Sequence, residues 1–186
     1  MTPQTKWVSR NIPFSCFIWN DTDTPLAFLI TFRTYGTWLH GDKRGSTDRF
    51  QNTYKTPRIP ASERWIQHNE RRLISAPLVL NSAQRRSVNA AVRDTCEHRR
   101  WYLHAINVRT NHVHCVVSIG TTKPGRALNA LKANATRQMR EDGNWPGTHS
   151  PWADKGSERY LWNEKSVAQA IDYVNNRQGG DLPDFD

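Results

Sequence analysis

Two histidines separated by one residue, His112 and His114, are the side chains of this sequence best suited to metal chemistry. They lie in the segment 105–119, which is rich in β-branched residues and therefore predicts extended structure. Because side chains alternate between the faces of a strand, both imidazoles point the same way, about 7 Å apart along the chain. Such a pair can converge on one divalent ion. A solvated sheet face is the alternative interpretation, and the rest of the chain must decide between them.

The composition predicts a single domain with a polyanionic partner. The chain has 186 residues, with 26 Lys and Arg against 17 Asp and Glu, and a formal net charge of +9. A basic excess of this size favours nucleic acid, although a basic surface without a partner is the alternative. Eight Trp and five Tyr suit contact with unstacked bases, while most of these rings are expected in the core.

The cysteine usage and the N-terminal sequence predict a soluble cytoplasmic protein. Cys16, Cys96 and Cys115 are widely spaced and form no CxxC pair, which favours a reducing compartment. The N-terminus lacks an apolar signal segment, and no apolar run approaches the length of a membrane span. A membrane partner is therefore not expected.

The elements that must position the histidines follow from periodicity and turn signals. Strands are expected over 26–34, 101–109, 112–119 and 159–162, and helices over 82–100, 124–141 and 167–178, with a short helix around 62–70. Thr110-Asn111 forms the tip of a hairpin between the second and third strands. Asn81-Ser82 is expected to cap the first long helix and Ser166 the last.

The order of these elements predicts an α+β fold of the ferredoxin-like, split βαβ type, with a C-terminal helix that bears Tyr173. Its antiparallel sheet has helices on one face, leaves the other face available, and carries the histidine pair on a central strand. The domain is expected to span residues 26–178, with an irregular basic insertion at about 40–80. An N-terminal arm, 1–25, precedes it, and an acidic tail, 179–186, follows.

Three segments carry a resemblance to a known family: His112-Val113-His114, the residues 31–39 (TFRTYGTWL), and the residues 170–176 (AIDYVNN). Over residues 26–178 the chain resembles the IS200-like single-tyrosine transposases, including the REP-associated tyrosine transposases, whose core is an HUH nuclease domain. The resemblance implies that His112 and His114 hold Mg²⁺ or Mn²⁺ against the scissile phosphate of single-stranded DNA. It implies that Tyr173 attacks this phosphate and forms a 5′-phosphotyrosine link.

The helical position of Tyr173 agrees with this implied role as nucleophile. Val167, Ala170, Ile171 and Val174 share an apolar stripe, and Tyr173 lies at its edge, about 60° from Ala170. A phenol at this position can pack its ring against protein and keep its hydroxyl in a cleft. A boundary tyrosine that only packs is the alternative.

The third metal ligand is where the sequence departs from the family. The family usually has Asn or Gln four residues after the tyrosine, and this chain has Arg177 there. Gln178 lies about 140° around an ideal helix from Tyr173. Either a distorted C-terminal turn brings Gln178 to the metal, or the metal keeps an extra water and Arg177 contacts DNA. We predict Gln178 as the ligand.

Basic and aromatic side chains around two segments predict the surface for single-stranded or hairpin DNA. Salt-sensitive phosphate contacts are expected from Arg33, Lys43, Arg44, Arg126, Lys132 and Arg137. Trp38, Trp145 and Trp152 lie in predicted loops and could stack on flipped bases.

The sequence leaves alternatives open for both the assembly and the activity of the protein. In the family, the tyrosine helix completes its own active site or that of a partner in a homodimer, and the sequence does not decide between them. Two other functions fit the same residues. One is a catalytically inert protein that binds DNA or RNA hairpins, and the other is a metal-dependent phosphodiesterase that uses water.

Overall fold

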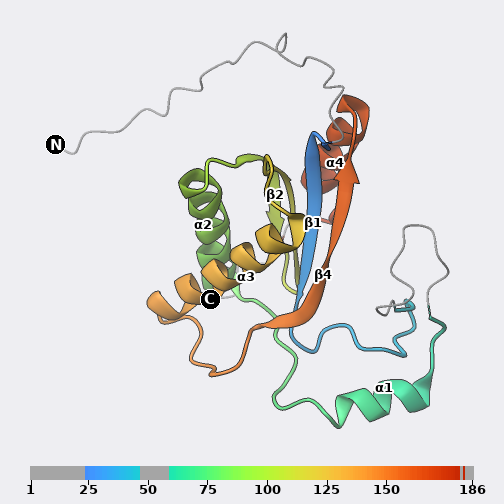
Figure 1. Cartoon of the computed structure of the whole chain (residues 1–186). Coiled ribbons are helices and arrows are strands. Elements are labelled where there is room, and N and C mark those ends of the chain that lie inside the picture. The colour runs from blue at the N-terminus through green and yellow to red at the C-terminus, as the bar shows by residue number, and fades with distance from the viewer. Residues whose placement is uncertain (1–23, 47–58, 181, 183–186) are drawn as a thin grey trace.

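The computed structural model describes residues 24–46, 59–180 and 182. In chain order its elements are β1 (Ala27–Thr34), α1 (Glu63–Glu70), α2 (Ser82–His98), β2 (Tyr102–Val108), β3 (His112–Ser118), α3 (Pro124–Glu141), β4 (Trp152–Leu161) and α4 (Glu164–Asn176) (Figure 1). The strands form one antiparallel sheet in the order β2-β3-β1-β4. The predicted α+β, ferredoxin-like class is confirmed, and β3, which carries both histidines, is a central strand.

The larger core lies between the sheet and the helices α2 and α3. Phe28, Ile30 and Phe32 of β1 alternate toward this side and pack with Val113, Cys115 and Val117 of β3. The cap predicted at the start of α2 is present and takes the form of a capping box. The Asn81 side chain accepts from the Gln84 N–H, and the Gln84 side chain accepts from the Asn81 N–H. These local signals fix two helices over one face of the sheet.

Helix α4 packs on the opposite face, which is also the face of the histidines. Its residues Ala170 and Val174 are buried in a second apolar cluster with Leu29, Val116 and Leu161. The expectation that this face is left available is therefore wrong in part. The apolar stripe of α4 covers part of this face of the sheet, because the stripe would otherwise be exposed to water.

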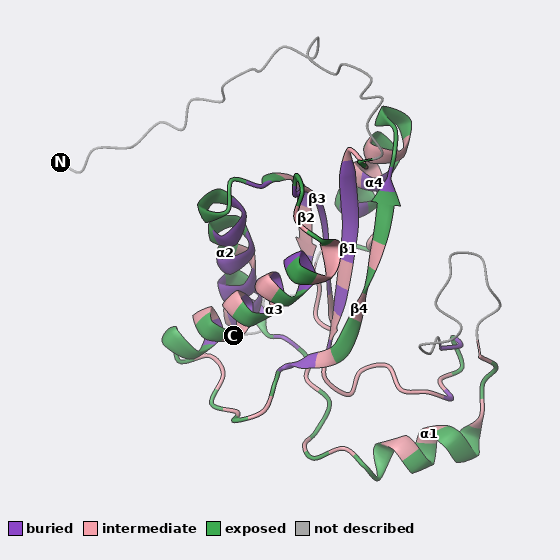
Figure 2. Ribbon diagram, viewed as in Figure 1, coloured by how far each residue is buried: buried purple, intermediate pink, exposed green. Residues whose placement is uncertain are grey.

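The starts of two elements differ from the sequence prediction by three residues or more. Strand β4 begins at Trp152, not at 159, because its polar early residues form an exposed edge strand and not a loop (Figure 2). A Cβ at Gly156 would lie 2.6 Å from the Thr31 carbonyl oxygen, so the close approach of β1 explains the glycine. Helix α4 begins earlier than predicted because Asn163, not Ser166, is its N-cap, and its side chain accepts from the Ser166 N–H at 2.9 Å.

The region between β1 and α2 holds the short helix α1, which lies apart from the sheet and has no buried residue (Figure 1). Cys96 and Cys115 are buried free thiols. None of the described helices is both long enough and apolar enough to cross a bilayer. Residues 1–23 and most of the acidic tail lie outside the described residues, so the predicted arm and tail stay predictions.

Candidate active site

His112 and His114 project from the same face of β3, with ring centroids 4.6 Å apart. The register of the sheet places Arg33 of β1 opposite His112, and Thr31 opposite His114. Directly opposed residues of an antiparallel pair share a face, so these four side chains form one strip of the sheet. His114 is only 7% exposed, and His112 is half-buried.

Each imidazole is held at its Nδ1 atom. His114 Nδ1 lies 2.7 Å from Thr31 Oγ1, and His112 Nδ1 lies 2.6 Å from Asn111 Oδ1. An amide oxygen only accepts hydrogen bonds, so this contact favours the tautomer of His112 that carries its proton on Nδ1. A neutral ring carries a single N–H, so in this tautomer Nε2 of His112 has a free lone pair.

Helix α4 and the residues after it bring Tyr173 and Gln178 to the histidines. The rings of Tyr173 and His114 meet edge to face, with centroids 5.4 Å apart. Tyr173 is 39% exposed, so it packs against the imidazole and still reaches solvent. Gln178 Oε1 lies 3.4 Å from His112 Nε2, and the Gln178 amide N–H donates to the Tyr173 carbonyl at 3.0 Å.

The position of Gln178 follows from where α4 ends. The helix stops at Asn176, and Arg177 has φ −120° and ψ 24°, outside the helical region. The angle of about 140° expected on an ideal helix therefore does not apply, and the distorted turn is the alternative that the geometry favours. Arg177 forms an ion pair with Asp172 at 2.8 Å. The Asn107 amide donates to the Val174 carbonyl at 2.9 Å and ties this end of α4 to β2.

Burial and nearby cations favour the neutral form of both histidines. Desolvation lowers the pKa of His114 to about 3, and the charges of His112 and Arg33 act in the same direction. Desolvation also lowers the pKa of His112. The nearby Gln178 Oε1, which favours a protonated Nε2, opposes this effect, and the charges of Arg33 and Arg109 reinforce it. Neutral imidazoles are the form that ligates a metal.

The donor set fits a divalent cation. With the proton of His112 on Nδ1, its Nε2 and Oε1 of Gln178 face each other as two lone-pair atoms, because the Gln178 amide nitrogen donates to the Tyr173 carbonyl. A cation bound to both atoms would remove their repulsion. Within the described part of the chain, no three His, Cys, Asp or Glu side chains group as a metal site. Gln178 Oε1, 3.4 Å from His112 Nε2, is the candidate for a further ligand beside the two histidines.

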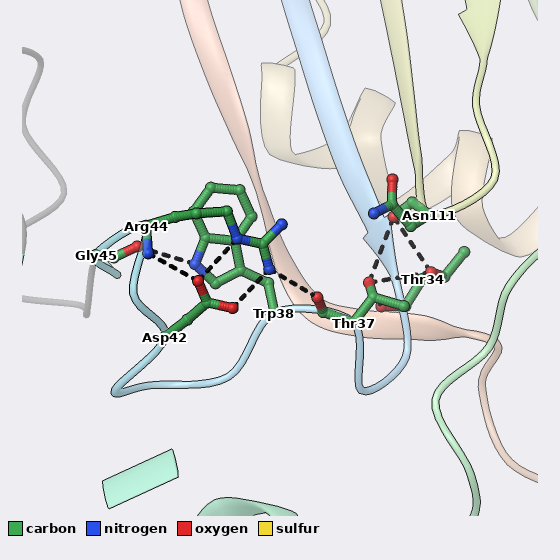
Figure 3. Close-up of polar contacts among 7 residues, drawn as sticks. All are labelled: Thr34, Thr37, Trp38, Asp42, Arg44, Gly45 and Asn111. Carbon is green, nitrogen blue, oxygen red and sulfur yellow. Dashed lines mark hydrogen bonds and ion pairs between the residues drawn. The ribbon is translucent and has the colours of Figure 1, made fainter. Parts of the chain in front are cut away.

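Arg33, Trp38, Lys43 and Arg44, which we predict to contact DNA, lie on β1 and in the loop that follows it. The guanidinium carbons of Arg33 and Arg44 lie 3.5 and 4.2 Å from the centre of a Trp38 ring. Arg44 also forms an ion pair with Asp42 at 2.6 Å (Figure 3), and Lys43 is exposed. Trp38 thus stacks with cations of its own chain. Arg33 takes part in this stack and also lies opposite His112 on the sheet.

The other predicted DNA contacts, Arg126, Lys132 and Arg137, lie on α3, which covers the face of the sheet opposite the histidines. Arg126 is exposed, and Arg137 is exposed and 3.6 Å from Glu141. Lys132 donates to the Ala153 carbonyl at 2.6 Å and is half-buried. The structure does not bring these three side chains to the histidines, and their contacts with DNA stay predictions.

Sequence reasoning missed the side chains that orient the site: Thr31, Asn107 and Asn111. Strand alternation was a usable signal for Thr31, because it shares a face with the histidines once β1 and β3 are paired. The bond of Asn107 to α4 depends on tertiary packing and had no local signal. The placement of Trp152 in a loop was wrong, since it begins β4, is 3% exposed and donates its indole N–H to the Lys132 carbonyl.

Comparison with known proteins supports the family resemblance. The family model described as "Transposase IS200 like" matches residues 74–176, which include both histidines and Tyr173. A REP-associated tyrosine transposase bound to a REP hairpin is similar in structure, with 13% identity, a TM-score of 0.47, and 81% of this chain and 65% of that chain covered. A candidate transposase from Deinococcus radiodurans R1 has 14% identity, a TM-score of 0.42 and coverage of 87% and 97%. The chain thus spans about two thirds of the first of these proteins, and no curated protein matches it.

Proposed function

This chain belongs to the IS200-like transposase family, and we propose that it is a metal-dependent single-stranded DNA endonuclease and strand transferase. The observation that supports this most strongly is the edge-to-face contact between Tyr173 of α4 and His114 of β3. This contact places the proposed nucleophile beside the proposed pair of metal ligands. The proposed substrate is single-stranded or hairpin DNA, in accord with the net charge of +9.

Tyr173 is the proposed nucleophile. A phenol is protonated at neutral pH and attacks only weakly until it gives up its proton. The Tyr173 oxygen forms a bond to the scissile phosphorus, and the bond from phosphorus to the 3′-oxygen breaks. The 3′-oxygen leaves as a hydroxyl, so the proton that it gains balances the one that the phenol loses. The 5′-phosphate remains on the tyrosine. Because one ester replaces another, a 3′-hydroxyl can reverse the step and join strands without ATP.

His112, His114 and Gln178 are the residues that would hold Mg²⁺ or Mn²⁺. Such a cation, when bound, supplies Lewis-acid stabilisation to the charge that develops on the phosphate. The bonds from Thr31 and Asn111 hold the two rings in place before substrate arrives. The guanidinium of Arg33, beside His112 on the same face, adds a positive charge for the DNA backbone.

The test is an incubation with end-labelled hairpin DNA that carries single-stranded flanks, in Mn²⁺ or Mg²⁺, followed by a denaturing gel. We expect a covalent protein–DNA adduct that is absent in Tyr173→Phe, although this variant still binds the hairpin. His112→Ala and His114→Ala are also expected to give no adduct. Tyr160→Phe is the matched control, because Tyr160 is an exposed tyrosine that pairs with Phe28, at the far end of β1 from Arg33 and His112. An adduct formed by Tyr173→Phe would show that another group is the nucleophile.

The same gel separates the two other functions. A hairpin-binding protein without catalysis would bind in EDTA and give no adduct with any metal. A phosphodiesterase would release free DNA ends in a reaction that Tyr173→Phe leaves unchanged. Either result would replace the proposed activity.

A further inference from the structure

We propose that Asn111 is a positioning residue that fixes which nitrogen of His112 carries the proton. A neutral imidazole holds its proton on Nδ1 or on Nε2, and only the bare nitrogen can bind a cation. The value of this choice rests on the proposed role of His112 as a metal ligand. The choice itself is a property of the metal-free protein and can be measured there.

Two amide oxygens compete for the single proton of His112. Asn111 Oδ1 lies 2.6 Å from Nδ1, whereas Gln178 Oε1 lies 3.4 Å from Nε2. Hydrogen bonds from N–H to O weaken beyond about 3.2 Å, so the proton resides on Nδ1 and is donated to Asn111. The Nε2 lone pair is thereby directed at Gln178, which is the arrangement that a bound cation requires.

The end of β1 holds the backbone of Asn111 in place. The Asn111 carbonyl accepts from the Thr34 N–H at 3.0 Å and from the Thr34 hydroxyl at 3.2 Å. The Thr37 hydroxyl lies 3.5 Å from the same carbonyl and 3.0 Å from the Thr34 carbonyl (Figure 3). Thr34 is fully buried, so its side of these bonds is shielded from water. The Leu80 N–H holds the neighbouring Thr110 carbonyl at 2.7 Å.

The same bonds connect the histidine to the loop that we predict to contact DNA. Arg44 donates to the Thr37 carbonyl at 3.3 Å and lies over the Trp38 ring (Figure 3). A continuous series of contacts therefore runs from Arg44 through Thr37 and Asn111 to His112. Asn111 contacts both the loop, through its backbone carbonyl, and the proposed metal ligand His112, through its side chain.

Long-range ¹H–¹⁵N NMR of the histidine rings in the metal-free protein tests the proposal. We expect the Nδ1–H form for His112 in the wild type. In Asn111→Ala the acceptor is lost, and the proton is expected to move to Nε2, where Gln178 Oε1 can accept it. The expected loss of Mn²⁺ affinity is about 10- to 100-fold, as for other residues that orient metal-bound histidines. Asn111→Asp keeps an acceptor oxygen and should restore the Nδ1–H form.

Two internal controls accompany these variants. Thr110→Ala changes the same hairpin tip without touching His112, and it should leave the tautomer and the Mn²⁺ affinity unchanged. His114 should keep its tautomer in every variant, because its Nδ1 faces Thr31. Asn111→Ala keeps the backbone carbonyl that Thr34 and Thr37 hold, and an amide spectrum unchanged outside the tip will verify its fold.

An Nε2–H form of His112 in the wild type would overturn the proposal without any variant. So would an Asn111→Ala protein that retains the Nδ1–H form, or one that changes tautomer and binds Mn²⁺ as tightly as the wild type. Failure of the wild type to form a DNA adduct would instead count against the proposed activity, since the tautomer is measured without DNA or metal.

Discussion

The burial of His114 makes this single residue sensitive to acid. Its pKa is about 3 in the folded protein, against an ordinary value of 6.5, chiefly because the ring is desolvated. As the pH falls below 6.5, the unfolded chain therefore binds a proton that the folded protein does not. The free energy of unfolding is then highest above pH 6.5 and decreases toward pH 3, by about 1.4 kcal/mol per pH unit for each such proton. Burial also lowers the pKa of His104 and His112, so both residues add to the loss of stability at low pH.

Urea denaturation at pH 7.5 and pH 5 measures this effect. We expect His114→Gln to reduce the difference in unfolding free energy between the two pH values, because one of the protons taken up on unfolding is removed. His68→Gln on α1 is the matched control, since His68 is exposed. An unchanged difference in His114→Gln would contradict the proposed cause.

The elements that the sequence predicts well are those with strong local signals. Asn81, as an N-cap, and Pro124, at the first position of α3, mark helix starts where the structure has them. Strand β4 lacks such a signal, because the residues 154–157 (DKGS) also suit a turn. Its pairing with β1, a long-range contact, decides its conformation.

The residues of the candidate site also differ in whether a local sequence pattern or a long-range contact places them. Alternation along one strand puts His112 and His114 on one face, so the pair could be predicted locally. The position of Gln178 depends on where α4 stops, and helix ends are set by contacts that a sequence does not display. The bond from Asn107 to Val174 is one such contact.

This contact makes the C-terminal end of α4 dependent on β2. The last carbonyls of a helix have no partner within it, and Asn107 supplies one for Val174 at 2.9 Å. Asn107→Ala should cost about 1 kcal/mol and loosen the turn that carries Tyr173 and Gln178. We expect faster amide hydrogen exchange over residues 173–178, measured by mass spectrometry, together with slower adduct formation.

Asn134→Ala is the matched control for this element. Asn134 donates to the Thr95 hydroxyl, also at 2.9 Å, between the helices on the opposite face of the sheet. It should leave exchange over residues 173–178 as in the wild type. Equal exchange in Asn107→Ala and wild type would mean that packing of Val174 alone holds the end of α4.

In the molecule as a whole, one face of the sheet forms the larger core and the other face carries the candidate site. The face toward α2 and α3 holds the larger core and supports the strands. The face toward α4 carries the histidines, Arg33 and the tyrosine helix. Because Ala170 and Val174 bury α4 against the sheet of the same chain, Tyr173 and His114 meet within one subunit. We therefore infer that a single chain supplies both the proposed metal ligands and the proposed nucleophile.

Mixing two inactive variants tests this arrangement. Tyr173→Phe retains the histidines, and His114→Ala retains the tyrosine, so a subunit pair that shared its tyrosine helices would contain one complete site. If each chain uses its own α4, every site in the mixture lacks one essential group, and no adduct with hairpin DNA is expected. The two variants, carrying tags of different size, are co-expressed and compared with each variant alone on a denaturing gel. An adduct on the His114→Ala chain, seen in the mixture and in neither variant alone, would show that its Tyr173 acts at the histidines of a partner subunit.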